Sequence, residues 1–155
     1  MGDLTLRRAV LLLALAASAC AGPPPLPPGA RPDLAREWVT PQGYRWPPDN
    51  GFGERATYLV LPPGMLLDRF GQDNGRFFSP RGAAFGARAL PSDCATLPYR
   101  VYRVQAPLLA RVGYALPWFG EPGGATQLLT DASAEQLLAD GTLVAVPGGE
   151  APCPR

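Results

Sequence analysis

The chain has 155 residues, which is enough for one domain and too few for two well-packed ones. Hydrophobic residues make up 46% of it and charged residues only 17%, while 18 glycines and 20 prolines require many tight turns. We therefore predict an α+β fold, in which a compact, β-rich single domain contains a small, bent, mostly antiparallel sheet and short helices.

The basic residues are all arginine, because the sequence contains neither histidine nor lysine. The lack of histidine excludes a Ser-His-Asp triad, a Cys-His pair, a zinc protease site and a histidine general base. The acidic residues are scattered and show neither an EF-hand spacing nor a Cys/His set. We therefore predict no metal site.

Residues 1–19 have the features of a secretory signal peptide, because Arg7 and Arg8 precede a short apolar run at 9–16. The sequence Ala-Ser-Ala-Cys that follows fits a simple cleavage site, which would give a secreted protein, or a lipobox that ends in a lipidated Cys20. A lipobox more often has leucine where this chain has Ala17. We expect lipidation, and hence an exported protein anchored by lipid in the bacterial cell envelope.

The number of cysteines supports lipidation, since an odd free thiol is a liability in an exported protein. If Cys20 carries lipid, Cys94 and Cys153 remain as an even pair. Their disulfide would close a loop of about 60 residues and contribute roughly 4 kcal/mol in the chain-entropy model. The alternative is two reduced thiols, which an oxidising compartment disfavours.

Residues 20–31 are rich in proline and predict an extended, semi-rigid tether between the lipid and the folded domain. Removal of the signal peptide leaves twelve arginines and twelve acidic residues, so the net charge from Cys20 onward is zero. A broad surface for nucleic acid is therefore not expected.

The folded domain is predicted at 32–155. A short helix is expected at 32–39, followed by an irregular stretch that ends near Gly53. The β-branched and aromatic residues that follow predict strands at 55–61 and 65–70, joined by a Pro-Pro-Gly turn.

The second half of the domain is expected to contain three more strands, at 99–104, 125–129 and 142–146. Between the last two, Ser133 and Gln136 have the spacing of a capping box, which predicts a short helix. Gly141 is expected to end this helix.

Three segments, 68–71, 75–78 and 118–127, combine a polar group and aromatic rings with glycine. Such segments suit a ligand with a charged part and a flat part, because arginine grips phosphate and aromatic rings stack on a heterocycle. The alternative is ordinary core packing of the aromatic residues Phe70, Phe77, Phe78, Trp118 and Phe119.

The motifs, taken together, resemble the TNT domain, the NAD glycohydrolase domain of tuberculosis necrotizing toxin, which is related to secreted fungal NADases. The resemblance covers about 44–146 with the motifs in the family's order. They are Trp-Pro-Pro-Asp-Asn-Gly-Phe at 46–52, Leu-Pro-Pro-Gly at 61–64, Asp-Arg-Phe-Gly at 68–71, Gly-Arg-Phe-Phe-Ser-Pro at 75–80, Arg-Ala-Leu-Pro at 88–91, Pro-Tyr-Arg-Val-Tyr at 98–102 and Pro-Trp-Phe-Gly-Glu-Pro-Gly-Gly-Ala-Thr-Gln at 117–127.

The resemblance implies hydrolysis of the bond between nicotinamide and ribose in NAD or NADP, with no cofactor. It implies Gln127, Arg69 and Arg88 as catalytic residues, and Phe70, Phe77, Arg76, Arg100 and Trp118 as substrate-binding residues. Nicotinamide leaves from a positively charged N-glycoside and so needs no acid, while a glutamine amide can orient ribose hydroxyls or water without carrying charge. A cognate inhibitor protein encoded elsewhere is a possible partner.

Each of these polar residues has a plain structural alternative. Arg69 can be a surface residue paired with Asp68 or Asp73, Arg88 can pair with Asp93, and Gln127 can be a solvated strand amide.

The chain also departs from the family pattern at three positions. Arg100 stands where histidine is frequent, Ala125 replaces the third glycine of a Gly-Gly-Gly-Thr-Gln motif, and Leu128 replaces an aromatic residue. Ala125 disfavours a positive φ at that position. Arg100 adds a permanent charge, so turnover or substrate preference can differ.

Two other functions remain open from the residues. One is a non-catalytic envelope lipoprotein that keeps the fold and binds a nucleotide or a protein. The other is a glycosidase that pairs Asp68 with Glu121 or Asp73, which requires two carboxylates about 5 to 9.5 Å apart across a cleft.

Overall fold

The computed structural model describes residues 22–154. The predicted signal peptide and the predicted lipidation site at Cys20 lie outside the described residues, as does the start of the tether. Within 22–154, no helix is long and apolar enough to cross a membrane.

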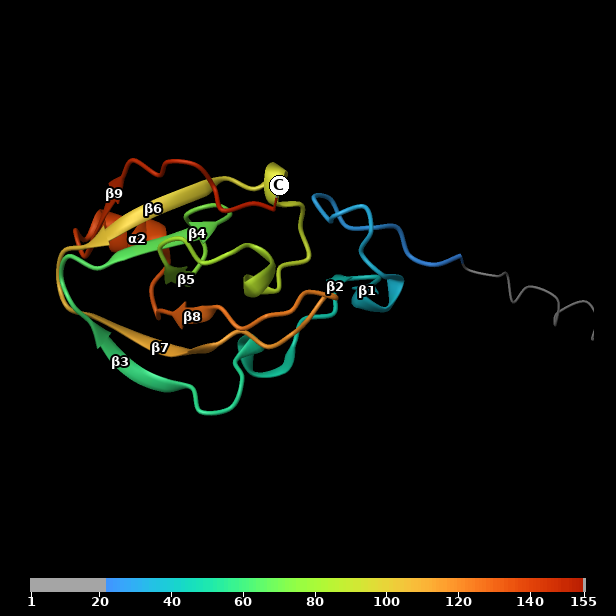
Figure 1. The fold of residues 1–155 in the computed structure, drawn as a ribbon, viewed down its shortest axis with the longest axis horizontal. Helices are drawn as coiled ribbons and strands as arrows, with labels where there is room; N and C mark the ends of the chain where they lie inside the picture. The colour runs from blue at the N-terminus through green and yellow to red at the C-terminus, as the bar shows by residue number, and fades with distance from the viewer. Residues whose placement is uncertain (1–21, 155) are drawn as a thin grey trace, which may run out of the picture.

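A seven-stranded antiparallel sheet dominates the fold, with the strand order β3-β7-β8-β5-β4-β6-β9. The sheet bends at β5, so that β4, β6 and β9 form one layer and β3, β7 and β8 form the other (Figure 1). The strands are β3 (Thr57–Leu61), β4 (Leu66–Phe70), β5 (Phe77–Pro80), β6 (Tyr99–Val104), β7 (Leu108–Tyr114), β8 (Thr126–Leu129) and β9 (Leu143–Val146).

The remaining elements are short. A two-stranded hairpin of β1 (Val39–Thr40) and β2 (Gly43–Tyr44) lies at the end of the domain nearer the N-terminal segment (Figure 1). The 3-10 turns are η1 (Arg36–Trp38), η2 (Pro48–Gly51), η3 (Gly86–Arg88) and η4 (Cys94–Thr96). The helix α2 (Ala134–Ala139) begins with the predicted capping box of Ser133 and Gln136.

The main core lies between the two layers of the sheet. Leu67, Phe78, Tyr102 and Leu128 are each at most 2% exposed there, and Leu137 of α2 packs against the same cluster. Burial of these side chains holds the layers together at one end. Residues of β4, β5 and β8, together with residues of the connecting loops, line the pocket described below.

The observed elements confirm much of the prediction. All five predicted strands form, and the capped helix forms where it was expected. The fold is compact and rich in β structure, but its sheet is larger and its helical content lower than an α+β fold with a small sheet implies. The predicted helix at 32–39 is wrong, because only the single turn η1 forms before the chain enters β1.

Two strands of the seven-stranded sheet, β5 and β7, have no counterpart in the prediction, and neither do the two short strands of the β1–β2 hairpin. The segment at 75–78 was interpreted only as part of a ligand site, and its last two residues begin β5. β7 pairs with β3 and β8 and lies between them, so its missing prediction accounts for most of the difference in sheet size.

Candidate active site

A pocket of about 360 Å³ opens where the two layers of the sheet diverge. Its volume falls within the usual range for small-molecule sites. It contains six of the predicted site residues: Arg69, Arg88, Gln127, Phe70, Phe77 and Trp118. The other lining residues are Trp46, Pro47, Asn50, Gly51, Phe78, Ser79, Ala89, Leu90, Ala115, Leu116, Phe119 and Ala125.

Arg69 places a buried positive charge in the pocket wall. The residue is only 8% exposed, and its Nε and Nη1 atoms have no hydrogen-bond partner within 22–154. Burial lowers the pKa of Arg69 below its ordinary value. A desolvated guanidinium with unused donors is well suited to bind a phosphate or another anion.

Gly75 leaves the space that the Arg69 guanidinium occupies. A Cβ atom at this position would lie 2.0 Å from Arg69 Nη2 and 2.4 Å from Nη1. The turn before β5 therefore needs glycine at this point for close approach to a side chain. The sequence identified Gly75 as part of a motif but gave no sign of this contact.

Arg88, unlike Arg69, has several protein partners. Its Nη2 lies 2.6 Å from Asp68 Oδ1, its Nε and Nη2 both donate to the Ala83 carbonyl, and its guanidinium carbon lies 5.0 Å from the centre of the Phe70 ring. The plain alternative of a pair between Arg88 and Asp93 is therefore wrong, and so is a pair between Arg69 and Asp68.

Asp68 is fully buried and holds this side of the pocket together. Its Oδ2 accepts hydrogen bonds of 2.8 Å from both the Gly82 N–H and the Tyr99 hydroxyl. Burial and the bond to Asp68 raise the pKa of Tyr99 to about 12. Asp68 thus joins β4, β6 and the loop that carries Arg88.

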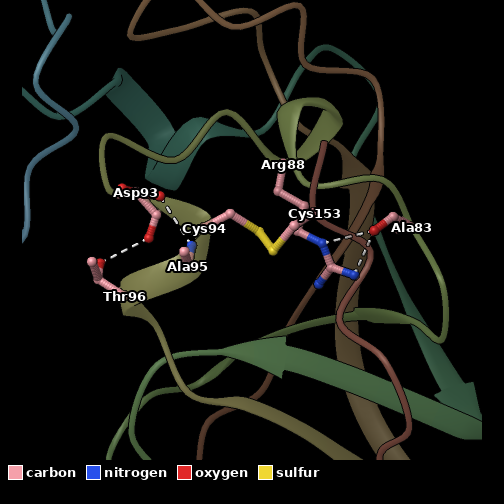
Figure 2. Close-up of a disulfide and its surroundings, with 7 residues drawn as sticks. All are labelled: Ala83, Arg88, Asp93, Cys94, Ala95, Thr96 and Cys153. Carbon is pink, nitrogen blue, oxygen red and sulfur yellow. Dashed lines mark hydrogen bonds between the residues drawn. A yellow bond between two sulfur atoms is a disulfide. The ribbon is translucent and has the colours of Figure 1, made fainter. Parts of the chain in front are cut away.

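A disulfide between Cys94 and Cys153 lies beside the same loop (Figure 2). The two Cα atoms are 5.7 Å apart, and both side chains belong to a cluster with Phe70 and Phe85. The Phe85 N–H also donates to the Pro152 carbonyl. The C-terminal segment is thereby fastened against residues 83–94, which contain Arg88.

Aromatic rings form the other walls of the pocket. Phe70 is buried against Phe85, whereas Phe77 keeps 41% of its surface exposed at the pocket. Trp118 donates its indole N–H to the Arg45 carbonyl, with a distance of 2.7 Å. Core packing alone therefore explains Phe70 but not the exposed ring of Phe77.

Gln127, in β8, lines the same pocket as Phe77, Arg69 and Arg88. Its Nε2 donates a 2.9 Å hydrogen bond to the Asn50 carbonyl in the η2 turn. Because this bond uses the amide nitrogen, Oε1 remains available as an acceptor. The side chain is thus a fixed amide in the pocket wall rather than a freely solvated one.

Backbone strain is concentrated around the pocket. Among residues 22–154, five non-glycine residues have a positive φ, and three of them line the pocket: Asn50 (φ 57°), Ala89 (φ 52°) and Phe119 (φ 54°). Such conformations cost of order 1 kcal/mol each and are often found at functional sites. Neither Ala89 nor Phe119 was predicted to have a left-handed backbone, because no local sequence signal indicates it.

Two predicted substrate-binding residues lie outside the lining of this pocket. Arg76 is exposed just before β5 and contributes its carbonyl to Thr130. Arg100 is also exposed, with its Nε atom 3.4 Å from Asp73 Oδ1. Arg100 does not line the pocket, although it lies opposite Arg69 in the register of β4 and β6.

Ala125, a departure from the family pattern, lines the pocket without strain. The left-handed conformations nearby belong to Gly123 (φ 66°) and Gly124 (φ 90°), and Ala125 does not have a positive φ. Alanine is therefore compatible with the loop before Gln127.

The paired-carboxylate alternative finds no support in this geometry. Asp68 is fully buried and occupied by protein partners, and Glu121 forms an ion pair with Arg31. The described residues that line the pocket include no acidic side chain. In addition, no group of three or more potential metal ligands occurs within 22–154.

Comparison with known proteins agrees with the resemblance to the TNT domain. The family model described as tuberculosis necrotizing toxin matches residues 60–146. The conidial surface nicotinamide adenine dinucleotide glycohydrolase nadA of Aspergillus fumigatus is 40% identical over an alignment of 119 residues, which covers 68% of this chain and 51% of that protein. This chain thus spans about half the length of that curated relative.

A solved structure of tuberculosis necrotizing toxin in complex with its immunity factor has a similar fold, with a TM-score of 0.58 and 26% identity. The match covers 68% of this chain and 65% of the toxin chain. Since the family model also covers more than half of the sequence and includes β4 to β9, the chain belongs to the tuberculosis necrotizing toxin family.

Proposed function

We propose that this protein is an NAD(P) glycohydrolase, which converts NAD or NADP and water to nicotinamide and ADP-ribose or its phosphate. The observation that carries the proposal is the pocket that combines Arg69, Phe77 and the fixed amide of Gln127. A dinucleotide substrate contains the three corresponding parts: a pyrophosphate, a flat nicotinamide ring and a ribose. Membership of the family and the name of the fungal relative support the same reaction.

The arginine side of the pocket binds the substrate in this proposal. Arg69 offers unused donors to the pyrophosphate, and Arg88 adds positive charge from a more rigid position. Phe70 and Phe77 border the nicotinamide, with the exposed ring of Phe77 available for stacking. Trp118 completes the aromatic wall.

The reaction needs little proton transfer. The bond between the ribose C1′ and the nicotinamide nitrogen breaks, and its electron pair leaves with nicotinamide as a neutral molecule. A water oxygen then bonds to C1′ and loses a proton to solvent. Gln127 Oε1 accepts a hydrogen bond from this water or from a ribose hydroxyl, which orients the reactants as positive charge develops on the ribose.

The direct test is to separate nicotinamide from ADP-ribose after incubation with NAD and with NADP. The full chain with Cys20→Ser should be produced through an oxidising export pathway. We expect nicotinamide release that falls by at least about a hundredfold in Gln127→Ala, since a transition-state interaction is lost. If the folded wild-type domain releases no nicotinamide from NAD or NADP, the glycohydrolase function is wrong and the non-catalytic binding function remains.

The position of the protein in the cell is a separate part of the proposal. We expect a signal peptide at 1–19, lipid on Cys20 and a tether at 20–31 that carries the catalytic domain at 32–155 on the cell envelope. Metabolic labelling with a fatty acid should mark the wild-type chain and not Cys20→Ser. If neither the wild-type chain nor Cys20→Ser takes up the fatty acid, and the protein is found in the medium, the protein is secreted rather than anchored.

A cognate inhibitor protein is the proposed macromolecular partner. The toxin structure named above is a complex with an immunity factor. We expect an inhibitor of this chain to cover the pocket, because a protein bound over a small site prevents NAD from entering it. Inhibition that competes with NAD would support this geometry, and inhibition that leaves the KM for NAD unchanged would contradict it.

A further inference from the structure

The η2 turn, which contacts Gln127, has an unusual backbone. Asp49 has φ 48° and ψ 41°, Asn50 has φ 57° and ψ 23°, and Gly51 has φ 77°. Three consecutive left-handed residues are rare in L-amino acid chains, and two of these are not glycine. The surrounding contacts must therefore hold the turn in this shape.

An ion pair from β7 fastens the first strained residue. Arg111 Nη1 lies 2.7 Å from Asp49 Oδ1, and Nη2 lies 2.5 Å from Oδ2. This two-point contact fixes direction as well as distance. The pair lowers the pKa of Asp49 and raises that of Arg111, so each charge favours the other.

The residue after the turn is held on the same strand. The guanidinium carbon of Arg111 lies 4.5 Å from the centre of the Phe52 ring, and Phe52 is only 3% exposed. A Cβ atom at Gly113, two residues along β7, would lie 2.9 Å from that ring. Arg111 and Gly113 together let the Phe52 ring, at the end of the turn, pack against β7.

The second strained residue contacts the proposed catalytic amide. Gly113, which lies against the Phe52 ring at the end of the turn, pairs in register with Gln127 of β8. The turn and Gln127 are therefore neighbours. The Asn50 carbonyl accepts the Gln127 Nε2 hydrogen bond, and the Leu116 N–H donates to the Gly51 carbonyl on the other side. The direction of the Gln127 amide is thus set by the backbone of the turn.

We propose that Asp49 and Arg111 are positioning residues, whose ion pair holds the left-handed turn so that the Asn50 carbonyl orients the Gln127 amide. The proposal rests on the glycohydrolase function for its effect on turnover, but the link between the ion pair and the amide does not depend on it. Neither residue lines the pocket, so neither is expected to contact substrate.

Two variants separate the ion pair from simple backbone strain. Asp49→Gly removes the carboxylate while glycine adopts a positive φ without penalty. Arg111→Met keeps an apolar stem beside Phe52 and removes the guanidinium. We expect each to lower kcat about tenfold with the KM for NAD within about twofold, because substrate binding is intact and the amide is misaligned. Arg103→Met, an exposed arginine on β6, is the matched control with unchanged kcat.

A second measurement does not require turnover. The side-chain amide resonances of Gln127 in a ¹⁵N–¹H spectrum should move in Asp49→Gly and Arg111→Met toward those of the exposed Gln105, and should stay fixed in Arg103→Met. Near-UV circular dichroism would verify folding. Fixed Gln127 resonances in both variants, or shifted resonances with unchanged kcat, would overturn the proposal. Absence of nicotinamide release from the wild-type chain would refute the proposed function alone.

Discussion

The two sides of the pocket are stabilised by different means. On the arginine side, Arg69 and Arg88 are largely buried, and the fully buried Asp68 balances Arg88. On the glutamine side, Gln127 is neutral and is held by a strained turn, whose ion pair at Asp49 and Arg111 is partly exposed.

This difference matches the role that we propose for each side. Binding of an anionic substrate requires positive charge in a poorly solvated place, and such charge is costly unless buried partners support it. Orientation of water or ribose requires only a fixed amide, so backbone geometry is sufficient. The comparison therefore predicts that damage to the arginine side affects stability and binding, while damage to the glutamine side affects turnover.

One of the two largest expected effects on stability comes from Asp68→Asn. This change leaves the buried Arg88 guanidinium without its negative partner, so the free energy of unfolding should fall by about 3 kcal/mol. Urea denaturation measures the loss, and Asp131→Asn, an exposed aspartate, is the control. A loss no larger than that of the control would mean that Asp68 does not stabilise the arginine side.

Removal of the disulfide should lower the free energy of unfolding by a comparable amount. In the chain-entropy model, Cys94→Ser with Cys153→Ser removes roughly 4 kcal/mol. Thermal unfolding of the oxidised and reduced wild-type protein measures the same difference. The side-chain amide resonances of Gln127 should not move, because the disulfide lies on the arginine side. Movement of these resonances would contradict the separation of the arginine side from the glutamine side.

Gly75→Ala tests binding with little change in stability. The new Cβ displaces the Arg69 guanidinium, so the KM for NAD should rise about tenfold while kcat changes by less than about threefold. Gly148→Ala is the control, since its Cβ would meet only ordinary contacts at 3.6 Å or more. An unchanged KM in Gly75→Ala would remove Arg69 from substrate binding.

The smallest expected effect is that of pH. The described lining residues include no acid, histidine, cysteine or tyrosine, so kcat should be flat between about pH 6 and pH 9. Arg111 lowers the pKa of Asp49, so the ion pair is present above the ordinary aspartate value and is lost only as the pH falls through the lower folded value. A steep limb near neutral pH in the kcat profile would contradict this account.

The sequence predicted the strands with strong alternation and the capped helix, because those signals are local. β7 was missed because Leu108–Tyr114 mixes alanine, glycine and arginine with its apolar residues, and its pairing with β3 and β8 supplies the missing preference. The helix expected at 32–39 is wrong because the chain forms only the turn Arg36–Trp38 before Val39 enters β1 and pairs with β2.

The candidate site was predicted largely through the family resemblance. Arg69, Arg88, Gln127 and the aromatic residues come together in one pocket, whereas Arg76 and Arg100 do not. The ion pair between Arg88 and Asp68 and the role of the η2 turn depend on contacts between segments distant in sequence. Spacing along the chain cannot reveal such contacts.

The division between a binding side and a turnover side is tested most directly by steady-state kinetics of Arg69→Met and Gln127→Ala with NAD. We expect Arg69→Met to raise KM at least about tenfold with kcat within a few-fold, and Gln127→Ala to lower kcat at least about a hundredfold with KM nearly unchanged. Comparable losses of kcat in both variants, or a Gln127→Ala protein with normal kcat, would contradict the account.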